Sequence, residues 1–245
     1  MRLWRIICIG AAMPRMAYDD AHIIILTGKD KARFLDGLSS NKIDFQDNQV
    51  ISTCILSNKA KILGQLHLFN LNEMLVGITI TDDFVKLVDY LNMKILGQDV
   101  GINDVTKLNY VDLIFDEEIS NVEISSKDGC TIVTIEGKYQ FEMYSTKLER
   151  RPCNTNLEAF NEWRIKHIIP WYGFEISSKK NPYQCGLNSQ VHENKGCFTG
   201  QEILTRMRTR GKGIYRLTCM ENDSLKPDEA STHGKEKSLV LKRGQ

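Results

Sequence analysis

The segment KGCFTGQEILTRMRTRGKG, residues 195 to 213, holds the most informative pattern in the sequence. Thr199 followed three residues later by Glu202 matches a capping box, which predicts a helix that starts at Gly200. Apolar residues then recur at helical spacing along one side, at Ile203, Leu204 and Met207. We therefore expect an amphipathic helix that packs on a core and presents its charged residues to solvent.

Cys197 lies just before this predicted helix, and Lys195 lies two residues ahead of it. The partial positive charge of a helix N-terminus and a nearby ammonium group both favour the thiolate form of a cysteine. The sequence therefore predicts a reactive thiol at Cys197, activated by Lys195. Gly196 and Gly200 permit a tight backbone path whose N–H groups face an anion or a polar ring. The alternative is that Cys197 is a small residue fitted into a crowded turn.

Basic charge is concentrated in the same region. Six basic residues against one acidic residue give residues 195–216 a net charge of +5, which leaves about −4 for the rest of a chain whose total is +1. The basic residues are Lys195, Arg206, Arg208, Arg210, Lys212 and Arg216. Such a strip fits either a solvated helix face or a weak, salt-sensitive contact with RNA.

The composition indicates a folded protein of 245 residues, of which 42% are hydrophobic and 26% charged. These values exclude disordered, collagenous and low-complexity chains, and the length suits one large domain or two or three interlocked small ones. No apolar run approaches the roughly 20 residues that span a bilayer, so no membrane partner is expected. We expect residues 1–15 to be a non-native start or a flexible leader, with translation starting at Met13 or Met16.

The seven cysteines are scattered, and none forms a C-x-x-C pair. This usage predicts a reduced, cytoplasmic protein. Cys185, His192 and Cys197 come nearest to a ligand set, but their spacing fits no common pattern, so no metal site is expected.

Short strands and helices alternate irregularly, which predicts the α+β class rather than a doubly wound α/β fold. Strands are predicted at residues 22–27, 50–56, 62–71, 75–80, 111–115, 122–125, 131–135 and 139–144. Further helices are predicted at residues 30–38, 84–95 and 154–168. Asn154 is the predicted cap of the last of these helices. The polar stretch 221–237 predicts a loop or a frayed tail.

KGCFTGQE, with Arg206 four residues beyond Glu202, closely resembles the signature of the YgfZ family of folate-binding proteins, relatives of the glycine-cleavage aminomethyltransferase. Other stretches similar to that family are KDKARFLDGLSSN (29–41), SNKAKILGQLHLF (57–69), WRIKHIIPWYG (163–173) and NPYQCGLNSQV (181–191). The resemblance implies an aminomethyltransferase-like folate-binding domain over residues 16–216, with a ferredoxin-like subdomain. It also implies that residues 217–245 are a shortened C-terminal region in which the family's β-barrel is reduced or missing.

The same resemblance implies a tetrahydrofolate-binding accessory protein of the cytoplasm. Such a protein supports assembly or repair of iron–sulfur clusters in client enzymes, including radical enzymes that modify tRNA. Its partners would be these client enzymes or cluster-assembly proteins, with weak contact to tRNA. The implied catalytic residues are Cys197 and Lys195, and the implied loop and motif residues are Gly196, Gly200, Gln201, Glu202 and Arg206. The implied folate-binding residues are Trp163, Arg164, Tyr172 and Asn188.

Some of these candidates have an alternative role. Aromatic faces bind flat heterocycles well, yet the spacing of four aromatic residues suits a core at least as well. These residues are Trp163, Trp171, Tyr172 and Phe174. Arg164 suits either the carboxylates of a folate tail or a surface ion pair with Glu158 or Glu162. His192 is a candidate base toward Cys197.

The chain also departs from the related transferases. Gly64 and Gln65 stand where aminomethyltransferases carry paired aspartates, one of them catalytic, which argues against classical one-carbon transfer. Ala60 and Ile168 stand where glycine is usual, and Lys166 where the transferases have a glutamate. Whether the chain is an enzyme is therefore open. The alternatives are a folate-dependent aminomethyltransferase and an RNA-binding accessory protein.

Overall fold

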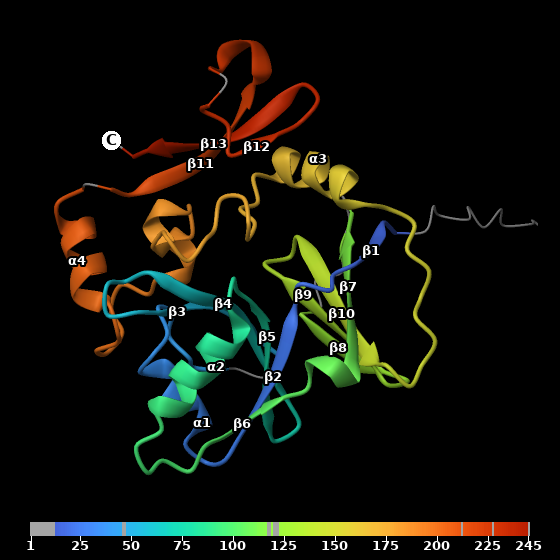
Figure 1. Ribbon diagram of the computed structural model, residues 1–245, viewed down its shortest axis with the longest axis vertical. Helices are drawn as coiled ribbons and strands as arrows, with labels where there is room; N and C mark the ends of the chain where they lie inside the picture. The colour runs from blue at the N-terminus through green and yellow to red at the C-terminus, as the bar shows by residue number, and fades with distance from the viewer. Residues whose placement is uncertain are drawn as a thin grey trace, which may run out of the picture.

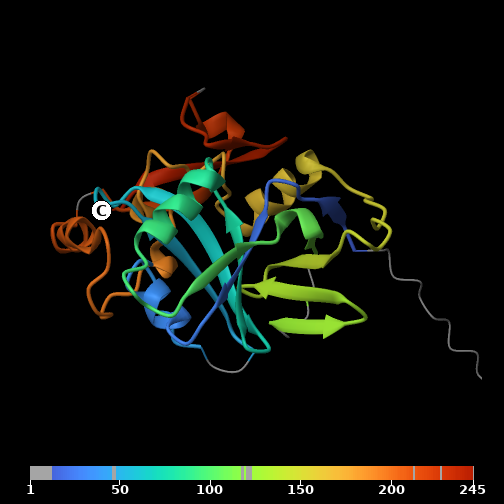
Figure 2. The same cartoon turned by 60° about the horizontal axis from the view of Figure 1, so that its bottom comes forward.

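The computed structural model describes residues 13–45, 48–116, 119, 123–211, 213–226 and 228–244. Within these ranges the chain forms three antiparallel sheets and four α-helices, which confirms the α+β class (Figure 1). Two five-stranded sheets lie next to each other, and a three-stranded sheet with one helix lies across one end of them (Figures 1 and 2).

The first sheet has the strand order β3-β4-β5-β2-β6. Its strands are β2 (His22–Thr27), β3 (Val50–Leu56), β4 (Ile62–Leu71), β5 (Met74–Ile80) and β6 (Gly101–Asp104). Helices α1 (Lys31–Asp36) and α2 (Phe84–Met93) cover one face, where Leu35 and Leu87 join Leu66 in one buried cluster. The series β2-α1-β4-β5-α2-β6 follows the β-α-β-β-α-β pattern of a ferredoxin-like unit, and β3 adds an edge strand to it.

The second sheet has the order β1-β7-β10-β9-β8. Its strands are β1 (Arg15–Ala17), β7 (Asn109–Phe115), β8 (Ile124–Lys127), β9 (Cys130–Ile135) and β10 (Tyr139–Ser145). One face packs on the side of the first sheet that faces away from α1 and α2, because Leu113 and Phe141 share a buried cluster with Phe69 and Ile78. The main core therefore lies between the two sheets.

Strand β1 begins inside the expected leader. Residues 1–12 lie outside the described residues, but Arg15 forms ion pairs with the buried carboxylates of Asp112, at 3.0 Å, and Glu142. The expectation of a flexible leader up to residue 15 is therefore wrong for Arg15, because this residue shares two buried carboxylates with Arg150 and Arg151.

Helix α3 (Leu157–His167) carries a fully buried arginine, Arg164. Its Nη1 donates to Oε2 of Glu175 at 2.7 Å, and its Nη2 donates to the hydroxyl of Thr232. The other carboxylate oxygen of Glu175 accepts from the hydroxyls of Ser231 and Thr232, both at 2.6 Å. This ion pair ties α3 and the segment after it to the C-terminal residues.

The C-terminal strands form an open sheet of order β11-β13-β12, not a closed barrel, as expected for a reduced C-terminal region. These strands are β11 (Tyr215–Glu221), β12 (Thr232–His233) and β13 (Lys237–Arg243). The stretch 221–237 is mostly loop, as predicted, but it is not frayed, because Thr232 is only 3% exposed. The expected boundary after residue 216 falls inside β11, and the division into domains stays a prediction.

The predicted strands and helices all occur, with shifted ends. Helix α3 starts later than predicted, since Asn156 is its N-cap and accepts from the backbone N–H of Ala159 at 3.0 Å. The prediction that Asn154 caps this helix is wrong. Asn154 instead accepts from the backbone N–H of Arg15 at 2.7 Å, because β1 passes close to the loop before α3.

Two residues that stand where the resemblance leads us to expect glycine adopt the left-handed backbone conformation. Ala60 lies at φ 56° in the β3–β4 turn, and Ile168 lies at φ 55° where α3 ends. Residues with a Cβ are strained in this region, and glycine is not, which gives a physical reason for glycine at both positions. The strain is greatest for Ile168 because its side chain is β-branched.

We predict that Ile168→Gly increases the free energy of unfolding by about 0.5 to 1 kcal/mol, because relief of the left-handed strain exceeds the added entropy of the unfolded chain. Ile168→Asn is expected to stabilise similarly, whereas Ile168→Ala keeps the Cβ and is the matched control. Urea unfolding of the three variants checks this. If Ile168→Ala stabilised the protein as much as Ile168→Gly, the strain would come from the side chain beyond Cβ and not from the left-handed backbone.

Candidate functional site

Helix α4 (Gln201–Thr209) occupies the predicted position, but its start differs from the prediction. Gly200 is the N-cap, at φ 82°, and no side chain caps the helix. The predicted capping box of Thr199 and Glu202 is therefore wrong, because the cap falls one residue later, on a residue without a side chain. The predicted apolar side is confirmed, since Leu204 is buried and its neighbours on that side, Ile203 and Met207, pack on the same core.

Gly200 brings two of the family-like stretches into contact. A Cβ at this position would lie 2.9 Å from Cα of Ala60 and 3.1 Å from the carbonyl oxygen of Ser57. Only glycine allows the segment before α4 to lie this close to the β3–β4 turn. Gly196, in contrast, faces open space. Of the two glycines beside Cys197, only Gly200 is required by the packing.

Lys195 is buried and directed toward the end of α1. Its Nζ donates to the carbonyl oxygens of Asp36, Ser39 and Asn41 at 2.6, 3.0 and 2.8 Å. The carboxylate of Asp36 lies 3.1 Å from the same Nζ. Burial lowers the pKa of Lys195, and Asp36 opposes this shift. The ammonium group thus satisfies carbonyls at and just beyond the C-terminal end of α1 and is directed there rather than to Cys197, in contrast to the predicted activating role.

The cysteines differ in exposure. Cys197 is exposed, as a reactive thiol requires, and so is Cys153, which sequence reasoning did not single out. Cys54 and Cys185 are buried, and burial raises the pKa of Cys185 to about 11 and that of Cys54 further. Burial also raises the pKa of Cys130, to about 12, assisted by Glu142. Among the described cysteines, only Cys153 and Cys197 are therefore exposed to solvent.

The remaining motif residues have separate roles. Gln201 orders the turn before α4, since its side-chain oxygen accepts from the backbone N–H of Phe198 at 3.3 Å. Arg206 pairs with Glu202 one helical turn away at 2.7 Å, and both side chains are largely exposed. Glu202 and Arg206 therefore pair with each other along the exposed side of the helix rather than with the loop before it.

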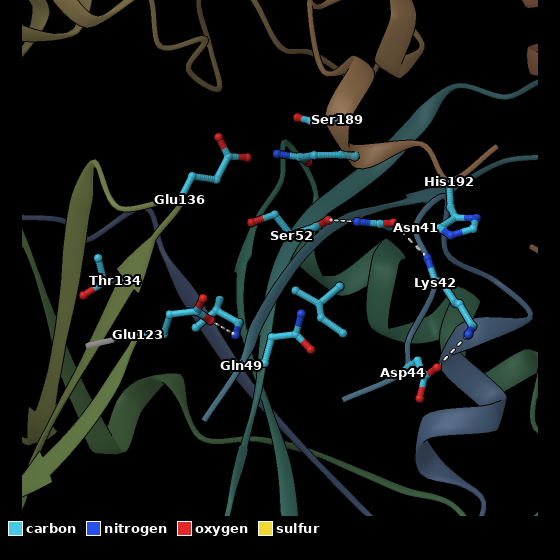
Figure 3. Close-up of a pocket in the computed structure, with 13 residues that line it drawn as sticks. Asn41, Lys42, Asp44, Gln49, Ser52, Glu123, Thr134, Glu136, Ser189 and His192 are labelled. Atoms are coloured by element: carbon cyan, nitrogen blue, oxygen red, sulfur yellow. Dashed lines mark hydrogen bonds and ion pairs between the residues drawn. The ribbon is translucent and has the colours of Figure 1, made fainter. Parts of the chain in front are cut away.

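A polar cavity of about 490 Å³ opens between the two five-stranded sheets (Figure 3). One wall comes from the second sheet and the turns beside it, the other from β3 and the residues before it, and the segment 189–192 closes one side. The lining residues are Asn41, Lys42, Asp44, Gln49, Val50, Ile51, Ser52, Glu123, Thr134, Glu136, Ser189, Gln190 and His192. The volume lies in the range of small-molecule sites, roughly 300 to 1,000 Å³.

Behind this cavity lies a buried network of neutral groups. The Gln65 amide donates to Oε1 of Gln190 at 3.2 Å, and the Cys54 thiol donates to the same oxygen at 3.8 Å. Ser40 Oγ donates to the backbone carbonyl of Gln190 at 2.6 Å and accepts from the Cys54 N–H. Gln65, at the position where the resemblance leads us to expect a transferase aspartate, is thus hydrogen-bonded to another amide and carries no charge.

Next to this network, His67 is buried between the sheets. Its Nδ1 lies 2.8 Å from Oγ of Ser52, a cavity residue, and Nε2 has no hydrogen-bond partner among the described residues. Tyr139 and Phe141 place their rings 6.5 and 5.7 Å away. Burial lowers the pKa of His67 to about 3, so the imidazole is neutral near pH 7.

None of the four predicted folate-binding residues lines the cavity. Arg164 is buried against Glu175, so neither the folate tail nor a surface pair with Glu158 or Glu162 occupies its guanidinium. Trp163 packs against Phe115 and Phe160. Tyr172 is 9% exposed, and its pKa is raised to about 12 by burial. The alternative prediction, that these aromatic residues belong to the core, is confirmed for both.

Asn188 and His192 lie closer to the cavity. Asn188 donates to the carbonyl of Tyr215 at 3.4 Å and precedes two lining residues, Ser189 and Gln190. His192 lines the cavity and accepts from the backbone N–H of Asn194 at 3.1 Å, so its Nδ1 serves the local turn rather than the Cys197 thiol.

In the described ranges, no cluster of three or more His, Cys, Asp or Glu side chains is arranged to hold a metal ion. Within those ranges, too, every helix is too short or too polar to cross a membrane.

The fold is that of an aminomethyltransferase-like protein. Aminomethyltransferase T of the glycine cleavage system of Bartonella henselae superimposes with a TM-score of 0.66 over 84% of this chain and 65% of its own, at 13% sequence identity. In sequence, the chain is 24% identical to an aminomethyltransferase of Nostoc sp. over 76% of its length, and 24% identical to a chloroplastic protein of Arabidopsis thaliana described as a transferase, over 85%. It spans 43% and 56% of those two relatives, about half their length. No protein-family model matches the chain.

We predict that Lys195→Met lowers the free energy of unfolding by about 2 to 4 kcal/mol, because several buried carbonyl oxygens and Asp36 lose their partner. Lys180→Met is the matched control, since Nζ of Lys180 donates to a single carbonyl, that of Glu175, at 2.9 Å. Its loss is expected to cost about 1 kcal/mol. Under native conditions, the iodoacetamide alkylation rate of Cys197 should stay within about twofold of wild type. A tenfold fall with an intact fold would restore the activating role of Lys195.

Because burial lowers the pKa of His67, we predict that the free energy of unfolding depends on pH. The unfolded chain takes up a proton near pH 6.5, whereas folded His67 does so only near pH 3. The contribution of neutral His67 to the free energy of unfolding is therefore complete above pH 6.5. It decreases by about 1.4 kcal/mol per pH unit as the pH falls toward 3. His67→Gln should remove this slope relative to wild type, and exposed His233→Gln should keep it. If the free energy of unfolding changed equally with pH in wild type and His67→Gln between pH 6.5 and 4.5, His67 would not be the source of the pH dependence.

Proposed function

We propose that this protein binds a reduced folate in the cavity between its two large sheets and serves iron–sulfur enzymes of the cytoplasm as an accessory protein, without aminomethyl transfer of its own. The observation that carries the proposal is the neutral Gln65–Gln190 pair behind a polar cavity, in an aminomethyltransferase-like fold. The resemblance of residues 195–206 to the YgfZ signature supports the same proposed function.

The cavity suits the two ends of a folate. The pyrimidine edge of a pterin presents adjacent N–H donors, which a carboxylate accepts as it accepts those of arginine. Glu123 and Glu136 line the cavity on the side of the second sheet, and Figure 3 shows both side chains on that wall. Glu123 accepts from the backbone N–H of Val50 at 2.6 Å, whereas Glu136 has only a longer, exposed ion pair with Lys138 at 3.4 Å, so Glu136 is the more available acceptor. Lys42, on the other wall, forms an exposed ion pair with Asp44 at 2.6 Å, and a carboxylate of the folate tail would take the place of Asp44 beside it.

Gln65 argues against one-carbon transfer. Amine transfer on folate needs a group that accepts or holds a proton, and an amide does neither at physiological pH. The nearest buried titratable groups, Cys54 and His67, are held neutral by burial. A bound tetrahydrofolate would supply a one-carbon carrier, and the residues behind the cavity would bind and orient it without exchanging protons.

The role toward iron–sulfur clusters rests on Cys197. Its thiol is exposed on a turn held in place by Gly200, Gln201 and Lys195, so it can meet a partner protein. The cavity and this thiol are separate places on the molecule, because Cys197 is not among the lining residues. Folate binding and the action of the thiol should therefore be separable by mutation.

Calorimetry with tetrahydrofolate under anaerobic conditions tests the folate site. We expect micromolar binding by wild type and by Cys197→Ala, and about tenfold weaker binding by Glu136→Gln, which loses a charge-assisted hydrogen bond. Glu149→Gln, an exposed residue outside the cavity, is the matched control. Absence of binding in wild type would overturn the folate site, and formaldehyde release from an aminomethylated carrier protein would establish the transferase alternative.

A second assay tests the role of the thiol. An oxidant-damaged [4Fe–4S] dehydratase is incubated with iron, sulfide and this protein, and recovery of its activity is followed. We expect faster recovery with wild type than with Cys197→Ser, and no loss with Cys153→Ser, the other exposed cysteine. Equal recovery with and without the protein would remove the iron–sulfur role while leaving the folate site intact.

A further inference from the structure

The cavity between the two large sheets has two chemically different ends. Figure 3 shows Glu123 and Glu136 on one side of it, and His192 and Lys42 on the other. The first side offers carboxylate acceptors to a ligand, whereas the second offers an imidazole and an ammonium group. A molecule that suits both ends therefore carries N–H donors at one end and an acceptor at the other.

The ring of His192 is held in place by its own segment. Its backbone N–H donates to the carbonyl oxygen of Ser40 at 3.0 Å, and the hydroxyl of Ser40 donates to the carbonyl oxygen of Gln190 at 2.6 Å. Its Nδ1 accepts from the backbone N–H of Asn194 at 3.1 Å. The ring and the main chain before it are thus ordered without a ligand, so a ligand that binds there has little ordering cost to offset.

The hydrogen bond from Asn194 also decides which ring nitrogen carries the proton. A nitrogen that accepts a hydrogen bond has a free lone pair, so in the neutral imidazole of His192 the proton resides on Nε2, at the far end of the ring. Among the described residues, none accepts a hydrogen bond from this Nε2, although the residue lines the cavity. The wall therefore holds a fixed N–H donor that lacks a protein acceptor.

Lys42 is a less selective group on the same wall. Its Nζ pairs with Asp44 at 2.6 Å, and the two side chains are 52% and 70% exposed. A ligand carboxylate beside Lys42 has to replace Asp44 and to order a long, solvated side chain, which offsets much of the gain. His192 carries neither cost, because its Nε2 has no acceptor to lose and its ring is already held.

We propose that His192 is the specificity-determining residue of this cavity and selects a ligand that carries a carboxylate at its end of the site. The inference rests on the proposed folate site and narrows it to folates with their glutamate tail. The pterin lies toward Glu136, and a tail carboxylate accepts from Nε2 of His192. A bare tetrahydropterin, which has no carboxylate, makes only the first of these contacts.

Two substitutions separate this role from the role of His192 in its own turn. His192→Asn keeps an oxygen that accepts from the backbone N–H two residues on, as in an Asx turn, so the turn is retained. Its shorter side chain does not carry a donor to the position of Nε2. His192→Asp keeps the same turn acceptor and adds a negative charge that repels a carboxylate. His233→Asn, at an exposed residue outside the cavity, is the matched control.

Calorimetry under anaerobic conditions with two probes, tetrahydrofolate and 6-methyltetrahydropterin, tests the proposal. We expect His192→Asn to bind tetrahydrofolate about tenfold more weakly than wild type does, and His192→Asp more weakly still, because a hydrogen bond to a charged acceptor is lost. Both variants should bind 6-methyltetrahydropterin as wild type does. Glu136→Gln should weaken the binding of both probes, since it acts at the pterin end, and His233→Asn should change neither affinity.

The outcomes distinguish this inference from the folate site itself. Equal tetrahydrofolate affinity in wild type, His192→Asn and His192→Asp would overturn the inference and leave the folate site standing. If the His192 variants lost affinity for both probes alike, His192 would act on the whole cavity rather than on a carboxylate, which also contradicts the inference. Absence of tetrahydrofolate binding by wild type would remove the folate site and this inference with it.

Discussion

The buried ion pair between Arg164 and Glu175 is the interaction on which the arrangement of the sheets depends. Both side chains are fully buried, and two charges in such a place are tolerated only when the remaining donors and acceptors are also satisfied. Asn161, the carbonyl of Ile169 and Thr232 complete this requirement for the guanidinium. Since Thr232 belongs to the C-terminal sheet, loss of that sheet would remove hydrogen bonds that this buried ion pair needs. The open three-stranded sheet is thus part of the fold rather than an appendage.

The same principle holds the signature segment in place. Lys195 inserts an ammonium group among the carbonyl oxygens at the end of α1, and Gly200 lets the backbone meet the β3–β4 turn at Ala60. Two segments far apart in sequence therefore clamp the turn that presents Cys197. The features that make 195–202 distinctive as a sequence are mainly those that fix its position, and the exposed thiol is what this arrangement displays.

The sequence predicted what is local. Hydrophobic spacing located the four α-helices and eight of the thirteen described strands to within a few residues, and the apolar side of α4 was identified from three residues. It did not predict β1, β6, β11, β12 or β13. It could not locate the partners of Arg164, which lie 11 and 68 residues away, or those of Lys195, which are backbone carbonyls about 155 residues away. The cavity was missed because its lining comes from several separate stretches, none of which carries a pattern alone. Glycine preferences at 60 and 168 were noted from the resemblance, and the left-handed backbone supplies their cause.

The neutral Gln65–Gln190 pair has a consequence for what the cavity can hold. Behind this cavity the titratable groups are a thiol and an imidazole that burial keeps uncharged near neutral pH, and the remaining contacts are amides and hydroxyls. The charged residues of the cavity, among them Glu123 and Glu136, stand on its other walls. The inner wall can therefore orient a bound molecule through neutral hydrogen bonds, while charge acts on it only from the rim.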